Sequence, residues 1–143
     1  MHNLYLIAEA DGTQFAIPAS AVENVVRDME IVPVPLAEPC VAGIAALRSR
    51  VVTVIDLMAA ISDARAGNCA GKPVIVTRID RHYYGFAVDR VRDIVEASEK
   101  PKRVAASMSE GWRKASTGFV ETEIGAVIVV DPELLLDTPA KAA

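Results

Sequence analysis

Few residues in this chain have the types and spacing that catalysis or metal binding requires. Its histidines, His2 and His82, stand near the N-terminus and in an expected hairpin turn, without cysteine or carboxylate neighbours at a spacing suited to zinc. The cysteines, Cys40 and Cys69, form no C-x-x-C pair, and we expect them to be reduced. The sequence also lacks a phosphate-binding glycine-rich loop and the motifs G-x-S-x-G and H-E-x-x-H. It therefore predicts neither an enzyme nor a bound metal or cofactor.

Two carboxylates, Asp56 and Asp131, remain as candidates for a reacting pair. Each follows an apolar, strand-like run and precedes a leucine-containing turn, and Pro132 follows Asp131 directly. An acidic residue before a short helix, with proline at the first helical position, is typical of an N-cap. We therefore expect both aspartates to cap helices.

The residues that do suggest a function lie in the stretch 43–57, GIAALRSRVVTVIDL. Its pattern predicts an apolar strand at 43–47, a tight turn at 48–50 and a β-branched strand at 51–55. The turn would present the guanidinium groups of Arg48 and Arg50 from an aliphatic surface. Such a group can bind a carboxylate while its stem packs on apolar neighbours, although a solvated turn charge is the alternative. The pattern indicates a protein-binding surface centred on Arg48.

The elements that must position this hairpin occur twice along the chain. A hairpin is expected at 4–17 and another at 74–88. Ser20 to Glu23 has the form of a capping box that starts a short helical turn, and Asp89 takes the place of Ser20 in the second copy. Each half is thus expected to contain a hairpin, a capped helical turn, a second hairpin and a second capped turn.

Two different shifts relate the halves. A shift of 69 residues aligns the first hairpins and the helical turns, whereas a shift of 75 places Gly43 on Gly118 and Asp56 on Asp131. The difference requires an insertion, expected in the loop 99–112. Self-similarity over much of a chain indicates a duplicated architecture.

Two short-stranded halves suit two small five-stranded β-barrels, because closing each sheet removes unpaired strand edges. We expect a mostly β fold with short helices in one domain, 1–143. Its subdomains are expected at about 14–72, with the N-terminal strand packed on it, and at about 73–136. The groove between them is a natural binding site. Trp112 is expected in the loop between repeat units, as a lid over the open end of one barrel, with a binding hot spot as the alternative.

Composition excludes several classes of protein. The chain has 143 residues, of which 52% are hydrophobic, so it is expected to fold. Its net charge of −4 and aromatic content of 5% argue against nucleic-acid binding, which favours basic faces and stacking rings. No apolar run approaches the ~20 residues of a membrane-spanning helix, and the N-terminus lacks the basic start of a secretory signal. We expect a cytoplasmic protein without direct membrane insertion and without a nucleic-acid partner.

Five stretches of the chain resemble the CheW family, the adaptors of bacterial chemotaxis. They are QFAIP at 14–18, AVENVV at 21–26, VPVP at 32–35, GIAALRSRVVTVIDL at 43–57 and YGFAVDRVRDIVE at 84–96. The resemblance implies two SH3-like β-barrels and no catalysis. It also implies an adaptor that joins the cytoplasmic tip of a methyl-accepting chemoreceptor to the regulatory domain of a CheA-type histidine kinase, in association with membrane receptor arrays.

The resemblance also implies a set of protein-binding residues. Arg48 matches the arginine of the family's L-R-G motif, and Glu23 matches the acidic residue of its V-x-E-I pattern, with a pairing between the two implied. Val22 and Val91 occupy equivalent positions in the halves, and they either belong to the core or line a groove that would accept a receptor helix. The full set is Val22, Glu23, Gly43, Arg48, Arg50, Val88 and Val91.

Three residues depart from the family signature within the arginine hairpin. Ala46 replaces the usual asparagine, Ser49 the turn glycine and Thr53 the proline. Ser49 would cost about 1 kcal/mol if its φ were positive. These departures favour a specialised member with a different receptor or kinase partner. The alternative function is a CheW-like scaffold, or a ligand-binding regulator, that serves a pathway outside taxis.

Overall fold

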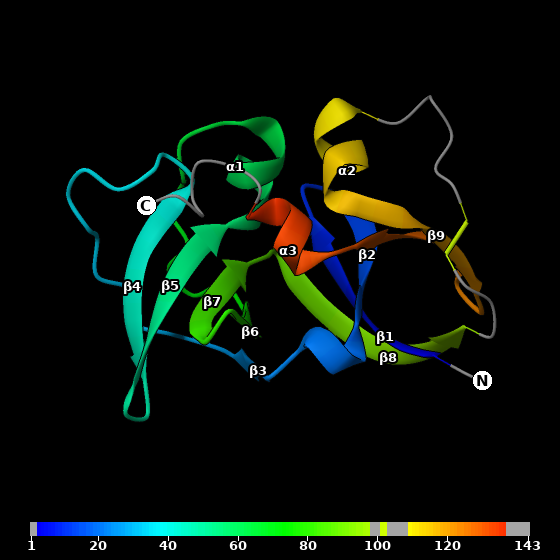
Figure 1. Cartoon of the computed structure of the whole chain (residues 1–143), viewed down its shortest axis with the longest axis horizontal. Coiled ribbons are helices and arrows are strands. Elements are labelled where there is room, and N and C mark those ends of the chain that lie inside the picture. The colour runs from blue at the N-terminus through cyan, green and yellow to red at the C-terminus, as the bar shows by residue number, and fades with distance from the viewer. Residues whose placement is uncertain (1–2, 98–100, 103–108, 137–143) are drawn as a thin grey trace.

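The computed structural model describes residues 3–97, 101–102 and 109–136. Within these ranges the chain forms two five-stranded sheets, which lie side by side in Figure 1. Sheet A has the strand order β8-β1-β2-β10-β9, and sheet B has the order β3-β6-β7-β5-β4. Contacts between β8 and β9 bring the two edge strands of sheet A together, as in a closing barrel. The predicted mostly β fold is confirmed.

Each sheet is built from short strands. The strands of sheet A are β1 (Asn3–Ala10), β2 (Thr13–Pro18), β8 (Arg90–Ala97), β9 (Ser116–Thr122) and β10 (Gly125–Val130). The strands of sheet B are β3 (Asn24–Val26), β4 (Val41–Leu47), β5 (Arg50–Asp56), β6 (Val74–Ile79) and β7 (His82–Ala87). The short helices gather above and between the sheets in Figure 1, and they are α1 (Leu57–Ser62), α2 (Glu110–Ala115) and α3 (Pro132–Leu135). None of the described helices is long and apolar enough to cross a bilayer.

Both predicted helix caps form. The Asp56 carboxylate accepts a hydrogen bond from the Ala59 amide at 3.3 Å, at the start of α1. The Asp131 carboxylate accepts one from the Glu133 amide at 2.9 Å, and Pro132 opens α3. Each carboxylate therefore satisfies backbone donors that the first helical turn leaves without partners.

The register of two parallel strand pairs shows the duplication. In sheet A, β10 runs parallel to β2 with Ile128 opposite Phe15. In sheet B, β5 runs parallel to β7 with Thr53 opposite Tyr84. The shift of 75 residues relates Thr53 to Ile128, and the shift of 69 relates Phe15 to Tyr84. The equivalent strands of the two sheets therefore pair in the same register.

The sheets do not follow the predicted subdomain ranges of 14–72 and 73–136. Sheet B takes the hairpin β6–β7 from the second half of the chain, and sheet A takes β1–β2 from the first half. Each half therefore gives its first hairpin to the other sheet. A hairpin follows from local turn and strand patterns, but the sheet that it joins depends on parallel pairing between residues far apart. Local patterns could predict the hairpins and not the exchange.

Two glycines mark the same close approach in both halves. Gly43 has φ of 154°, and a Cβ placed there would lie 2.2 Å from the carbonyl oxygen of Val32. Gly118 has φ of 143°, and its Cβ would lie 2.1 Å from the carbonyl oxygen of Lys102. In each case the residue whose carbonyl approaches the glycine forms an isolated β-bridge with the residue that follows the glycine, Val32 with Ile44 and Lys102 with Phe119. Gly43 is thus required by the backbone itself.

The apolar core has an inner cluster within each sheet and a shared cluster between the sheets. Val127 and Val129 belong to the inner cluster of sheet A, and Val52 and Val54 to that of sheet B. The shared cluster includes Phe15, Ile17, Ile55, Ile75 and Phe86. Because side chains alternate along a strand, burial of both faces explains the consecutive apolar residues of strands such as β6 and β10.

Trp112 lies in helix α2 and not in a loop over one barrel, so the predicted lid is wrong. Its side chain belongs to the shared cluster and is 8% exposed. The ring centroid lies 5.7 Å from that of Phe15, in a tilted arrangement that aromatic pairs favour. Trp112 therefore joins helix α2 to sheet A.

The predicted capping box at Ser20 is also wrong. Residues 19–21 form a single 3₁₀ turn, η1 (Ala19–Ala21), which follows Pro18 and has no side-chain cap. The amide of Glu23 donates to the Val76 carbonyl at 2.8 Å, which starts β3 as an edge strand of sheet B. In the second half, Asp89 precedes β8 and no helix. Sheet pairing has here prevailed over a weak local helix signal.

Some residues named above lie outside the described part of the chain. These are His2 and the greater part of the loop expected to hold the insertion, at 99–100 and 103–108.

Candidate protein-binding surface

A shallow depression at one end of sheet B brings three predicted site residues together. Glu23, Arg48 and Arg50 line it, and its volume is about 230 Å³. The remaining lining residues are Asn24, Leu47, Ser49, Val52, Val76 and Tyr83. The depression thus combines two guanidinium groups and a carboxylate with an apolar floor.

The β4–β5 turn and a parallel strand pair position the arginines. The turn confirms the predicted hairpin, and Arg48 adopts φ of 59° within it. β5 lies beside β7, so Arg50 reaches Tyr83. Arg50 donates a hydrogen bond to the Tyr83 hydroxyl, and its guanidinium lies 4.7 Å from the centroid of the ring. Arg50 is therefore held in place, whereas Arg48 extends from the turn into solvent.

The pairing of Glu23 with Arg48 that the resemblance implied does not form. Both side chains are exposed and line the depression, yet within the described part of the chain neither takes part in an ion pair. Both charges therefore stay available to a partner.

The other four predicted site residues lie elsewhere. Val22 and Val91 are half-buried and pack against the shared cluster, so each combines a core contact with an accessible face. Val88 is 1% exposed and belongs to that cluster. Gly43 is buried beneath Val32. A direct contact with a partner is thus available to Val22 and Val91, while Val88 and Gly43 are buried toward the end of sheet B opposite the depression.

Sequence reasoning missed Tyr83 and Arg78 as parts of the site. These residues face each other across the β6–β7 hairpin, and the Arg78 guanidinium lies 5.8 Å from the Tyr83 ring centroid. The two-residue turn at 80–81 would have predicted that pair. Nothing in the local pattern could have placed Arg50 beside them, because that contact depends on the parallel pairing of β5 with β7.

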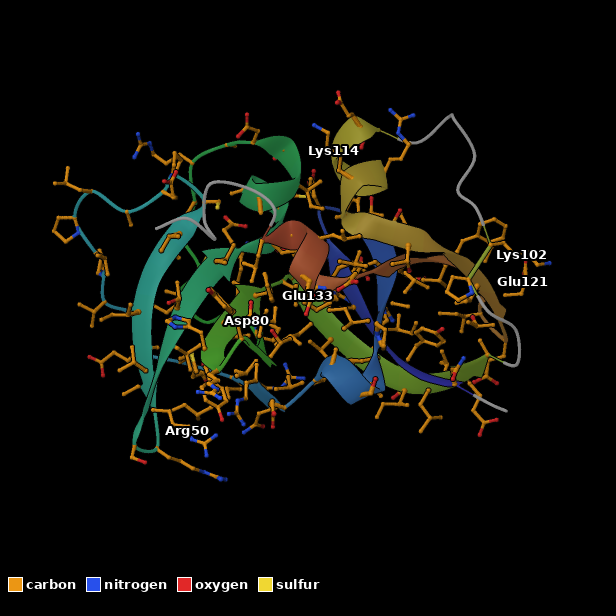
Figure 2. The ribbon with its side chains drawn as sticks, viewed as in Figure 1. Arg50, Asp80, Lys102, Lys114, Glu121 and Glu133 are labelled. Carbon is orange, nitrogen blue, oxygen red and sulfur yellow. The ribbon has the colours of Figure 1, made fainter. Side chains whose placement is uncertain are left out.

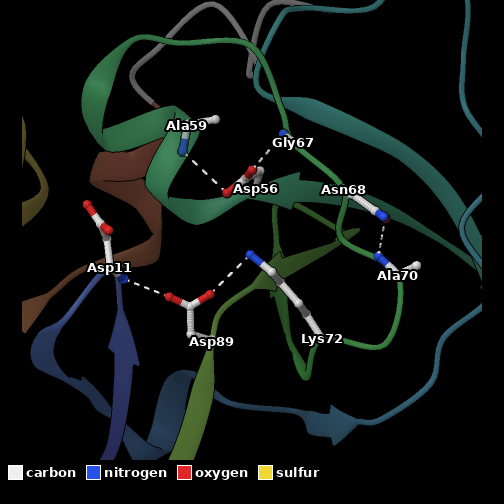
Figure 3. A network of polar contacts seen from close by, with 8 residues as sticks. All are labelled: Asp11, Asp56, Ala59, Gly67, Asn68, Ala70, Lys72 and Asp89. Atoms are coloured by element: carbon white, nitrogen blue, oxygen red, sulfur yellow. Dashed lines mark hydrogen bonds and ion pairs between the residues drawn. The ribbon is translucent and has the colours of Figure 1, made fainter.

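A polar network connects the two sheets near the opposite end of sheet B (Figure 3). The Asp89 carboxylate accepts a hydrogen bond from the Asp11 amide at 2.7 Å and forms an ion pair with the Lys72 ammonium at 3.0 Å. The Asp11 hydrogen bond, and then the Lys72 ammonium, lower the pKa of Asp89. The same contact with Asp89 raises the pKa of Lys72. The network ties the β1–β2 turn of sheet A to the segment that leads into β6.

The two cysteines are free thiols, as predicted. Both Cys40 and Cys69 are buried, and the loss of hydration on burial raises the pKa of each thiol. A buried thiol with a raised pKa is a poor nucleophile. Neither residue therefore adds reactivity to the surface.

Comparison with known proteins decides the family. A family model described as the CheW-like domain matches residues 4–140. The chain belongs to the CheW family. A chemotaxis protein CheW from Thermotoga maritima is 29% identical over 129 residues, which cover 90% of this chain and 84% of that protein. The family consists of scaffold proteins and not enzymes, in agreement with the prediction from the catalytic motifs.

A solved structure shares the fold of this CheW-family chain. The crystal structure of the scaffolding protein TtCheW from Thermoanaerobacter tengcongensis matches with a TM-score of 0.85. The match covers 100% of this chain and 98% of that chain, at 20% sequence identity. The two-sheet architecture is therefore that of the family.

The three departures from the CheW signature have visible surroundings in sheet B. Ala46 is exposed on β4, and the Thr53 hydroxyl lies 3.1 Å from the His82 Nε2 atom. Of the two central turn residues, Arg48 and not Ser49 has a positive φ. The backbone strain expected for Ser49 therefore falls on Arg48, where a left-handed conformation costs about 1 kcal/mol. Strain of this kind gathers at functional sites.

Proposed function

We propose that this protein is a non-catalytic chemotaxis adaptor. It couples the cytoplasmic tip of a methyl-accepting chemoreceptor to the regulatory domain of a CheA-type histidine kinase, and it works in the cytoplasm. The match of the CheW-like domain model to residues 4–140 carries this proposal. A relative named as a chemotaxis protein and a fold shared with a scaffolding protein support it.

The depression on sheet B is the proposed contact surface. Arg48 is exposed and strained, and it forms no ion pair with any other described residue, so its guanidinium can bind a carboxylate of a partner. Glu23 and Arg50 line the same depression and fix the pattern of charge around it. The half-buried Val22 and Val91 extend the proposed surface toward the boundary between the sheets.

A pull-down with two purified baits tests the proposal. One bait is a chemoreceptor cytoplasmic tip, and the other is the regulatory domain of a CheA-type kinase. We expect both to retain the unmodified protein, and Arg48→Glu to weaken retention by at least about tenfold, because a reversed charge repels the carboxylate it would bind. Arg65→Glu is the matched control, since Arg65 is exposed beyond α1 at the other end of β5. Retention of the unmodified protein by neither bait would refute the proposal.

A specialised scaffold outside taxis is the second candidate. The substitutions at positions 46, 49 and 53 all fall on the hairpin that forms the depression, and they favour a changed partner. Retention by another protein with a CheW-like fold, without retention by either bait, would favour this candidate.

A further inference from the structure

Four arginines lie at one end of sheet B. Arg48 and Arg50 belong to the β4–β5 turn and the start of β5, whereas Arg78 and Arg81 belong to the end of β6 and the β6–β7 turn. The two turns directly precede β5 and β7, which run in parallel, so both turns lie at the same end of the sheet. Figure 2 shows Arg50 at this end. All four side chains are exposed, and we call them the arginine cluster.

Tyr83 holds two members of the cluster close together. The guanidinium of Arg50 lies 4.7 Å from the Tyr83 ring centroid, and that of Arg78 lies 5.8 Å from it. Attraction to the ring offsets part of the repulsion between the two cations. Among the described residues, no carboxylate forms an ion pair with any member of the cluster. The cluster therefore presents donors without an internal anion.

The floor beside the cluster is apolar. Leu47 and Tyr83 are half-buried there and pack against the inner cluster of sheet B, above the fully buried Val52 and Val76. A ligand for this end of the sheet must thus satisfy guanidinium groups at the rim and an apolar surface at the centre.

The duplication supplies an internal comparison. At the equivalent end of sheet A, the shifts of 69 and 75 residues put acidic residues or glycine at the four positions. The pairs are Arg78 with Glu9, Arg48 with Glu123, Arg81 with Gly12 and Arg50 with Gly125. Moreover, Glu9 is neutralised within the chain by Arg92, at 3.1 Å. The fold therefore does not require arginines at these positions.

We propose that the arginine cluster binds an acidic segment of a partner protein in which carboxylates flank an apolar side chain. The carboxylates accept hydrogen bonds from Arg48, Arg50 and Arg78, and the apolar side chain rests on Leu47 and Tyr83. This inference deepens the proposed function, on which it rests, by naming the chemistry that the partner must offer. A nucleic-acid backbone fits less well, because it carries no aliphatic side chain to cover the apolar floor at Leu47 and Tyr83.

A peptide titration followed by amide NMR tests the site directly. The probe is a short peptide with one leucine between two pairs of glutamates, and the control replaces each glutamate by glutamine. We expect shift changes confined to the depression and the cluster, at residues 23–24, 47–52 and 76–83, with binding at least about tenfold weaker for the control peptide and for Arg50→Gln/Arg78→Gln. Equal binding of both peptides, changes elsewhere in the chain, or preference for a single-stranded DNA probe would overturn the inference.

A partner assay separates this inference from the proposed function. With the kinase regulatory domain or the receptor tip as ligand, Arg50→Gln/Arg78→Gln should bind about tenfold more weakly than Arg65→Gln/Arg113→Gln, which removes two exposed arginines elsewhere. Equal binding by the two variants overturns the inference and leaves the adaptor role intact. If the unmodified protein binds neither ligand yet the acidic peptide still titrates the cluster, the adaptor role fails and the inference stands.

Discussion

Replacement of Gly43 or Gly118 by alanine should destabilise the protein by about the same, large amount. Each position combines a positive φ with a Cβ that would lie 2.2 Å or 2.1 Å from a backbone carbonyl oxygen. The conformation costs about 1–2 kcal/mol for a residue with a side chain, and forced overpacking adds about 1–3 kcal/mol. The free energy of unfolding should thus fall by about 3 kcal/mol, a large fraction of the ~5–15 kcal/mol typical of a domain.

Two other glycines separate the cost of the positive φ from the cost of the contact between the added Cβ and a carbonyl oxygen. Gly12 has φ of 78° and open space around its Cβ, so Gly12→Ala should cost about 1 kcal/mol from the backbone alone. Gly67 has neither feature, since its Cβ would meet only an Asp56 carboxylate oxygen at 3.7 Å, and Gly67→Ala should be nearly neutral. Urea unfolding followed by circular dichroism measures all four variants. If Gly43→Ala were as stable as Gly67→Ala, the claim that the backbone requires glycine at position 43 would be wrong. Loss of partner binding by that stable variant would then assign Gly43 to the interface.

Three further predictions concern stability. The lowered pKa of Asp89 implies that this carboxylate contributes fully to the free energy of unfolding above pH 3.8, its ordinary pKa, and that the contribution is lost as the pH falls through the pKa of the folded state. Asp89→Asn should therefore reduce the loss of stability at acid pH, and an unchanged loss would show that the Asp89 network is not its source. Arg81 has φ of 67° in the β6–β7 turn, so Arg81→Gly should raise the unfolding free energy by up to about 1 kcal/mol in urea, and a loss of stability would contradict this. Trp112→Ala should cost about 3–5 kcal/mol by thermal or urea unfolding, whereas a cost below about 1 kcal/mol would contradict its place in the shared cluster.

The local elements of this fold could be predicted from sequence because short-range chemistry determines them. A proline after Asp131 and an apolar run before Asp56 were sufficient to predict both helix caps. The arginine hairpin likewise followed from two apolar strands around a polar turn. The capping box at Ser20 failed because the Glu23 amide pairs with a strand that lies far along the chain.

The candidate site could be predicted only in part. Arg48, Arg50 and Glu23 were predicted from the hairpin and the family resemblance, and they line one depression. Tyr83 and Arg78 were missed because their role depends on β7 lying beside β5, and that pairing belongs to the exchange of hairpins between halves. Gly43 and Val88 were predicted as binding residues, yet both are buried, since position in a motif does not distinguish a residue that contacts a partner from one that packs inside the fold.

The central claim is that this chain couples a receptor to a kinase, and co-sedimentation tests it most directly. Membranes that carry a chemoreceptor are mixed with a CheA-type kinase, with or without the protein, and the kinase in the pellet is measured. The account predicts that the kinase sediments with the membranes only when the protein is present, and that Arg48→Glu reduces this effect while Arg65→Glu does not. A pelleted fraction of kinase that is the same with and without the protein would contradict it.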